Sequence, residues 1–390
     1  MASSRGVTVS CAIAGNDPAT HEEAPLPMNF RWFLAASLLL LLCSGTPARA
    51  SGVAMHVGAP IHPVEVSGGE RLVYELHVGN TFGTPVEITA LDVLDDDNRL
   101  LLHLDECALG SRITLEDGST VIAPHAQAVL YLTVDAGAKT PIFLRHRLTL
   151  KQAGVVSTLT GTEIPVSADR NPVLAPPVAQ GTWVAVYSDA WPRGHRRVFI
   201  EIHGHARLPG RFAIDWMKVD NRGRTLKDDS GLAASSLSYG AKVRAVADAR
   251  VAAVRDGVSE AARIADNKTH PHSDAAGNFI SLDLGHGRFA TYEHLRPGSI
   301  TVAKDDHVRV GQVIAEVGFS GDSTEPHLHF HVSDSAMPLE GEGLPYALDR
   351  FRVVGRVTDW NAFGSQRWKD GSPRIVEHAF PESGDVIDFD

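Results

Sequence analysis

Histidines occupy every second position near the end of the run Glu325-Pro-His-Leu-His-Phe-His-Val332. Side chains alternate between the two faces of a β-strand, so His327, His329 and His331 are expected on one face and the apolar residues between them on the other. An exposed strand face usually varies among residues such as Lys, Thr and Glu. Three histidines on one face therefore favour a metal site.

The first half of the chain also predicts strands. Short alternating segments recur from Gly52 to about residue 167, as at residues 72–78, where every second residue is apolar, and no stretch has a helical period. We expect an all-β domain at residues 51–170, an immunoglobulin-like β-sandwich of roughly 110 residues. Its sequence offers no cluster of ligands or nucleophiles, which favours a spacer or binding module.

A proline-rich connector at residues 168–182 marks the domain boundary, because such a segment cannot pair inside a sheet. We assign residues 171–364 to a second β-domain. Its strands are expected at residues 196–202, 211–219, 242–254, 278–284, 288–294, 312–317 and 327–332. The polar segment 257–277 is expected to be a surface loop. Residues 365–390 lack a pattern and are expected to be a flexible tail.

Residues 1–50 are interpreted as an N-terminal extension and a secretory signal peptide with cleavage after Ala50. The apolar run from Trp32 to Cys43 follows a short positive flank and precedes a small-x-small sequence. It is shorter than the roughly 20 residues of a membrane span. We expect an exported protein, periplasmic or extracellular, with no stable membrane span after cleavage. Residues 1–27 do not suit a signal peptide, so Met28 is an alternative start to Met1.

Charge and cysteine content also exclude some properties of the chain. The formal net charge is -11, with no dense basic stripe, which argues against nucleic-acid binding. Of three cysteines, only Cys107 follows the expected cleavage point, so the mature chain can form no intramolecular disulfide.

The histidine strand follows two other recognisable segments, Tyr292-Glu-His-Leu295 and the residues 308–314. In this order they resemble the core of the lysostaphin-like, LytM-type zinc metallopeptidases. The resemblance covers roughly residues 183–355, and the histidine strand is its most specific part. It implies an antiparallel β-sheet peptidase domain, one Zn²⁺ per chain, and an endopeptidase that acts on stem or cross-bridge peptides of peptidoglycan in the cell wall.

The same resemblance implies roles for individual residues. Residues 211–216 are similar to the strand that carries the family's metal-binding aspartate, and residues 239–248 to the strand after it. Asp215 and His329 would then be metal ligands. His294 and His327 match the two histidines that handle protons without binding the metal.

The first metal-binding histidine departs from the family pattern. It usually stands four residues before the aspartate, where this chain has Arg211, which cannot ligate a cation. His195, His203 and His205 are the candidates. Residues 204–210 look like a hairpin turn, which would return the strand containing His195 alongside the aspartate and leave the other two histidines at the turn. We predict His195. Three ligands leave a fourth position open, as in catalytic zinc sites.

Two other interpretations stay open. A non-catalytic relative would keep the fold as a module that binds cell wall or activates a partner hydrolase, and Arg211 favours it. Against it, the chain keeps four matching residues, Asp215, His294, His327 and His329. The segment 306–318 also resembles β-hairpins of lipoyl- and biotin-carrier domains, but the matching region offers no lysine at an exposed turn.

Overall fold

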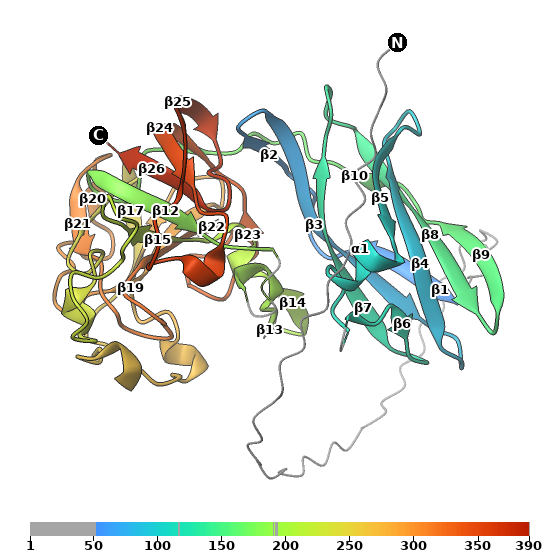
Figure 1. Cartoon of the computed structure of the whole chain (residues 1–390), viewed down its shortest axis with the longest axis horizontal. Coiled ribbons are helices and arrows are strands. Elements are labelled where there is room, and N and C mark those ends of the chain that lie inside the picture. The colour runs from blue at the N-terminus through green and yellow to red at the C-terminus, as the bar shows by residue number, and fades with distance from the viewer. Residues whose placement is uncertain (1–51, 116–117, 190, 192–193, 390) are drawn as a thin grey trace, which may run out of the picture. The chain divides into compact units, whose positions relative to one another are not determined.

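The computed structural model describes residues 52–115, 118–189, 191 and 194–389, and their regular elements are almost all strands (Figure 1). The chain from Arg49 onwards groups into one compact unit. The expected signal peptide and its cleavage point after Ala50 lie outside the described residues. Within the described part of the chain, no helix combines the length and the apolar character that crossing a membrane requires.

The N-terminal part contains two antiparallel sheets. In the first sheet, β3 (Gly69–Asn80) pairs with β1 (Val53–Val57), β2 (Pro63–Val66) and β7 (Gln127–Asp135). The second sheet consists of β4 (Val86–Leu94), β5 (Leu100–Asp105), β6 (Val121–Ile122), β8 (Phe143–Gln152), β9 (Val155–Thr160) and β10 (Ile164–Pro165). The short helix α1 (Glu106–Gly110) follows β5.

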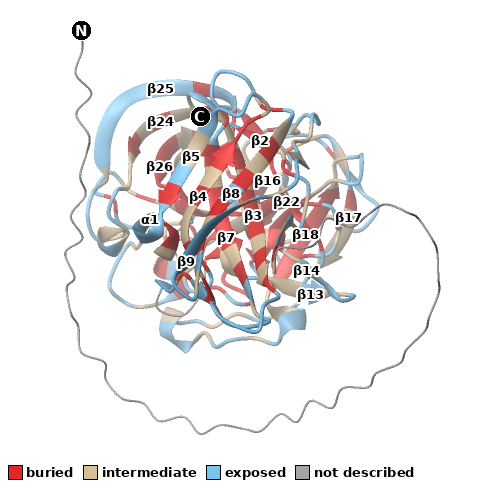
Figure 2. Ribbon diagram, turned by 90° about the vertical axis from the view of Figure 1, so that its right-hand side faces the viewer, coloured by how far each residue is buried: buried red, intermediate tan, exposed pale blue. Residues whose placement is uncertain are grey.

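Alternation along the strands explains why the two sheets share a core. Leu72, Leu76 and Val78 on β3 are fully buried and belong to the same apolar cluster as Leu91 on β4 and Leu148 on β8. Figure 2 shows buried and partly exposed segments alternating along β3 and β4. The expectation of an all-β first half is confirmed, and its immunoglobulin-like character stays a prediction.

The C-terminal part is organised around one twelve-stranded sheet, in the order β11-β24-β26-β12-β15-β22-β19-β18-β17-β20, with β23 beside β22 and β25 beside β24. Its strands are β11 (Val173–Leu174), β12 (Gly181–Val186), β15 (Ile214–Lys218), β17 (Ala249–Arg255), β18 (Asn278–Asp283), β19 (Phe289–Leu295), β20 (His307–Val308), β22 (Leu328–Ser333), β23 (Gly343–Leu344), β24 (Ala347–Arg356), β25 (Lys369–Ala379) and β26 (Asp385–Phe389).

Two smaller sheets and several 3₁₀ turns complete this part. β13 (Ile200–Ile202) pairs with β14 (His205–Arg207), and β16 (Lys242–Arg244) pairs with β21 (Val313–Glu316). The turns are η2 (His195–Arg197), η3 (Pro209–Phe212), η4 (Ala233–Ser235), η5 (Ile264–Asp266), η6 (His272–Asp274) and η7 (Trp360–Ala362). The segment 257–277, expected to be a loop, contains only η5 and η6 and none of the named strands.

The centre of the large sheet is fixed by apolar residues on one face of neighbouring strands. Ile214 and Trp216 on β15 and Leu328 and Phe330 on β22 are fully buried in one core. A slip of one residue would move this whole set to the other face. The polar residues between them, including Asp215, are therefore held together on the opposite face.

The end of the chain differs from expectation. Residues 365–390 were expected to be a flexible tail, but β25 and β26 belong to the large sheet, and Ile387 and Phe389 lie in its core. Most residues of β25 are exposed. A strand with so few buried side chains shows no apolar period in the sequence, which is why the expectation was wrong for β25. β26 is mostly buried but has only five residues.

Replacement of a buried residue in the last strand tests this correction. Ile387 is fully buried, so Ile387→Ala should lower the free energy of unfolding by about 2–5 kcal/mol through lost burial and a cavity. Ile375 on β25 is 47% exposed, and Ile375→Ala should change stability by less than about 0.5 kcal/mol. Urea unfolding followed by tryptophan fluorescence measures both. Equal small effects would favour the flexible tail after all.

Candidate metal centre

Three possible metal-binding side chains converge where β15 and β22 lie side by side. Asp215 is the register partner of His329, and its Oδ1 lies 2.9 Å from His329 Nδ1. His195 approaches from η2 and places Nε2 2.9 Å from Asp215 Oδ2. The ligand atoms of the three residues all lie within 4.8 Å of one another. The structure thus brings together the three residues that the sequence suggested as ligands.

His195 reaches this position by a route different from the expected one. It lies in the 3₁₀ turn η2 and not on a strand beside Asp215. The hairpin turns at His203 and Gly204, which both have left-handed backbone angles, so residues 204–210 are not its turn. His203 and His205 are exposed on this hairpin, and neither lines the cavity that contains His195.

The set of two imidazoles and one carboxylate suits zinc. Ligand atoms that share one tetrahedral ion lie roughly 3.3 Å apart, and the two contacts of Asp215 are of that order. His195 Nδ1 lies 3.3 Å from the carbonyl oxygen of Ala213. When Nδ1–H donates to this carbonyl, the lone pair of the ring lies on Nε2, the atom that faces Asp215. The residues present therefore fit a zinc ion.

The electrostatics of this cluster also suit a cation. Burial alone would raise the pKa of Asp215, but His195 and His327 hold it well below its ordinary value. Burial lowers the pKa of His329 below its ordinary value, despite the contact with Asp215. An ionised carboxylate and a neutral imidazole are the states that bind a metal. Burial lowers the pKa of His195, but Asp215 raises it above its ordinary value, so His195 would release a proton when it binds the ion.

His294 and His327 lie beside the three residues, with their rings 4.9 Å apart. His327 Nδ1 is 2.6 Å from the carbonyl oxygen of Glu325, and His294 Nδ1 is 2.8 Å from that of Ser320. Each ring can donate Nδ1–H to its carbonyl, which leaves Nε2 to take up or release a proton. His327 Nε2 lies 3.2 Å from Asp215 Oδ1.

The backbone at His294 interrupts the alternation of β19. Its φ of 60° is left-handed, a conformation that non-glycine residues rarely adopt. In a regular strand His294 would point to the same face as Tyr292, which is fully buried in the core. Instead the consecutive residues Glu293 and His294 both line the cavity. This break in the strand brings the ring of His294 to the metal-centre side.

Glu293 and His331 form a second buried pair that the sequence did not single out as a unit. His331 Nδ1 lies 3.5 Å from Glu293 Oε1, and both side chains are almost fully buried. Burial raises the pKa of Glu293 to about 8, with a contribution from the charge of Asp215. Glu293 is the register partner of His329. Its position directly before His294 was the available signal, but an unbroken strand would have placed Glu293 and His294 on opposite faces.

These residues line a cavity of about 410 Å³. Its polar lining residues include His195, Asp215, His294, His327 and His329. Its apolar lining residues include Trp191, Val198, Ile200 and Leu339. Ala275 is the one lining residue from the segment 257–277 among the described residues.

Residues 235–340 match the model for peptidase family M23. The M23 segment contains His294, His327 and His329, whereas His195 and Asp215 precede it. No curated protein matches the chain.

Solved M23 structures are among those similar to the chain. A variant of the catalytic domain of the prophage-encoded M23 protein EnpA from Enterococcus faecalis is 17% identical, with 45% of this chain and 93% of that chain covered and a TM-score of 0.26. The catalytic domain of lysostaphin from Staphylococcus simulans is 20% identical, with 43% of this chain and 88% of that chain covered and a TM-score of 0.23. A zinc-containing peptidase from Vibrio cholerae is 14% identical, with 74% of this chain and 83% of that chain covered and a TM-score of 0.23.

The raised pKa of Glu293 predicts a pH dependence of stability in the metal-free protein. Its pKa rises from 4.5 to about 8 on folding, so the folded chain retains a proton that the unfolded chain releases. Its contribution to stability is therefore present below pH 4.5 and is lost as the pH rises towards 8, by an amount on the order of a few kcal/mol.

Glu293→Gln should remove this contribution. Urea unfolding of chelator-treated protein between pH 5 and 8.5 measures the unfolding free energies of wild type and variant. The wild type should lose stability as the pH rises and the variant should not, so the difference between the two free energies should shrink. Glu377→Gln, an exposed change on β25, is the control. A constant difference across this range for Glu293→Gln would contradict the pKa assignment.

Proposed function

We propose that the chain is an exported, zinc-dependent endopeptidase that hydrolyses peptide bonds in the stem or cross-bridge peptides of peptidoglycan. The observation that carries this proposal is the convergence of His195, Asp215 and His329 beside two histidines that can exchange protons at Nε2. The match of residues 235–340 to the model for peptidase family M23 supports a peptidase. The predicted signal peptide supports a substrate outside the cytoplasm.

His195, Asp215 and His329 would hold one zinc ion per chain. A zinc ion with three protein ligands supplies a Lewis acid that polarises a peptide carbonyl and lowers the pKa of a water towards neutrality. The chain's part is to ionise Asp215, to keep His329 neutral and to leave one coordination position free of protein.

His327 and His294 would handle the protons and the developing charge. His327 Nε2 lies within hydrogen-bond distance of a proposed ligand, so it is within reach of a water beside the three ligands. His294 lies on the same side, with its ring held by the Ser320 carbonyl. We assign to this pair the orientation and deprotonation of the water and the stabilisation of the oxyanion. The two carbonyl bonds fix both rings before substrate binds.

The cavity suits a short segment of peptide. Its volume of about 410 Å³ lies within the range of ligand sites. Trp191, Val198 and Ile200 give the cavity an apolar surface in addition to the histidines. An extended chain could pack aliphatic side chains on these apolar residues while its carbonyl group approaches the metal centre.

The alternative is a non-catalytic module that binds cell wall or activates a partner hydrolase. The observation in its favour is Arg211, which stands at the usual position of the first histidine ligand and is buried in ion pairs with Glu75 and Glu342. In this chain a third ligand must therefore come from elsewhere, and the enzyme proposal depends on His195.

Metal binding tests the ligand assignment. The fragment 51–390 should bind one zinc per chain, and His195→Ala, Asp215→Asn or His329→Ala should each weaken binding by more than roughly 100-fold, because a direct ligand is lost. His205→Ala is the matched control and should retain zinc. Metal analysis and competition with a chelator measure the affinities. Full binding by His195→Ala with loss in His205→Ala would reverse the assignment of the first ligand.

Hydrolysis tests the enzyme proposal. Zinc-loaded protein should release peptides from purified sacculi, and a chelator should stop the release. His327→Ala and His294→Ala should keep zinc but lower turnover by about 10²–10⁴-fold, as expected for lost proton transfer. His307→Ala, an exposed histidine, is the control. A zinc-loaded wild type that binds sacculi without cleaving them would favour the non-catalytic module.

A further inference from the structure

Arg196 follows His195 directly and is almost fully buried, with 4% of its side chain exposed. Its guanidinium group donates to β3 and β7 of the N-terminal part. The acceptors, at 2.6–2.9 Å, are the Glu75 carboxylate, the Tyr74 and Leu132 carbonyls and the Thr133 hydroxyl. The residue after the proposed ligand is therefore held by the N-terminal sheets.

Glu75 also forms an ion pair with a second arginine. Arg211 places Nε at 2.8 Å and Nη2 at 2.7 Å from Glu75 Oε2. Glu75 is 2% exposed, and the two arginines hold its pKa below the ordinary value although burial would raise it. One buried carboxylate thus joins the residue after His195 to the residue four positions before Asp215.

The rest of this segment also packs on the N-terminal part. Arg197 donates to the carbonyl oxygen of Ser111 at 2.9 Å and stacks over the ring of Tyr131 at 4.6 Å. Phe199 makes an edge contact with His77, with ring centroids 5.9 Å apart. Segment 195–199 is consequently seated on β3, β7 and the end of α1.

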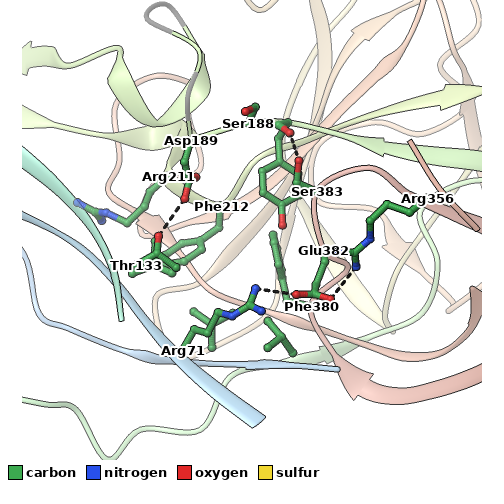
Figure 3. Close-up of a pocket in the computed structure, with 14 residues that line it drawn as sticks. Arg71, Thr133, Ser188, Asp189, Arg211, Phe212, Arg356, Phe380, Glu382 and Ser383 are labelled. Carbon is green, nitrogen blue, oxygen red and sulfur yellow. Dashed lines mark hydrogen bonds and ion pairs between the residues drawn. The ribbon is translucent and has the colours of Figure 1, made fainter. Parts of the chain in front are cut away.

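The loop before His195 is tied to the same place. Asp189 accepts hydrogen bonds from Thr133 Oγ1 at 2.9 Å and from Arg196 Nη1 at 3.2 Å. Figure 3 shows this hydrogen bond between Thr133 and Asp189, which both line a second cavity. Both sides of His195 along the chain are therefore anchored to β7.

The large sheet gives His195 less support than it gives the other two proposed ligands. Asp215 and His329 lie on paired strands in register. His195 lies on a turn, and the following hairpin is a separate sheet of two strands. Its contacts with the C-terminal part include the Ala213 carbonyl and the close approach of Gly210.

We propose that Glu75 is a positioning residue for the metal ligand His195, acting through Arg196, so that the N-terminal sheets are required for full metal affinity. This inference rests on the proposed function. A ligand must lie about 2 Å from zinc. A turn held by buried, charge-assisted hydrogen bonds presents its imidazole at that distance with little loss of freedom on binding.

The first test is the zinc affinity of Glu75→Gln in the fragment 51–390. Glutamine keeps the size but removes the charge that holds Arg196, and affinity should fall by about 10–100-fold, as for other groups that orient metal ligands. The Co²⁺ absorption spectrum should change in shape, because one ligand is displaced. Thr133→Val is a milder second variant, which removes one acceptor of Arg196 and should shift affinity in the same direction. It keeps the test decisive if Glu75→Gln does not fold.

Glu382→Gln is the matched control. Glu382 also receives two arginines, Arg71 from β3 and Arg356 from β24, each at 2.7 Å (Figure 3). It links the same two parts of the chain, but none of its described ion pairs involves residues 195–199. Its loss should loosen the junction and leave zinc affinity within about twofold, which is the range of additive, uncoupled effects.

A double-mutant cycle separates positioning from general destabilisation. In a His195→Ala background, Glu75→Gln should cause no further loss of zinc affinity, since its effect passes through His195. An equal loss in both backgrounds would overturn the inference. Unchanged affinity of Glu75→Gln and Thr133→Val, with loss in His195→Ala, would overturn it while the proposed function stands. A wild-type chain that binds no zinc would overturn both.

Discussion

The antiparallel pairing of β15 with β22 is the constraint on which the rest of the site depends. Ile214 and Trp216 on one strand and Leu328 and Phe330 on the other bury their side chains in one core, so the register cannot slip without exposing all four. The same pairing leaves Asp215 and His329 adjacent on the opposite face, together with Glu293 on β19. Burial of these apolar side chains thus stabilises an arrangement of polar groups that would not form without it.

Residues whose position follows from local alternation could be predicted from the sequence. The strand at residues 327–332 and the strand at residues 72–78 have a clear period of two, and both lie in the sheets as expected. The failure at residues 365–390 has the opposite cause. β25 is mostly exposed and joins the sheet through backbone hydrogen bonds, which leave no trace in the side-chain pattern.

The candidate site divides in the same way. Asp215, His294, His327 and His329 could be placed by their resemblance to the family's motifs, and the structure gathers them at one cavity. The element that carries His195 was predicted wrongly, because a 3₁₀ turn held by distant residues has no local signal. Arg196 and Glu75 are 121 positions apart in the chain, and their ion pair exists only once the turn η2 lies against β3. The left-handed backbone at His294 is likewise a product of tertiary structure.

The buried carboxylate of Glu75, shared between two arginines, bears on how freely such domains can be recombined. A substitute first domain could be joined at the proline-rich connector and still fold, yet it would have to offer a carboxylate at the same depth and two carbonyl acceptors beside it. Without them, Arg196 would keep only Asp189 and Arg211 only Glu342 as ion-pair partners, and two buried guanidinium groups would be left partly unpaired. Only a replacement first domain that carries the same buried polar groups could therefore take the place of the present one.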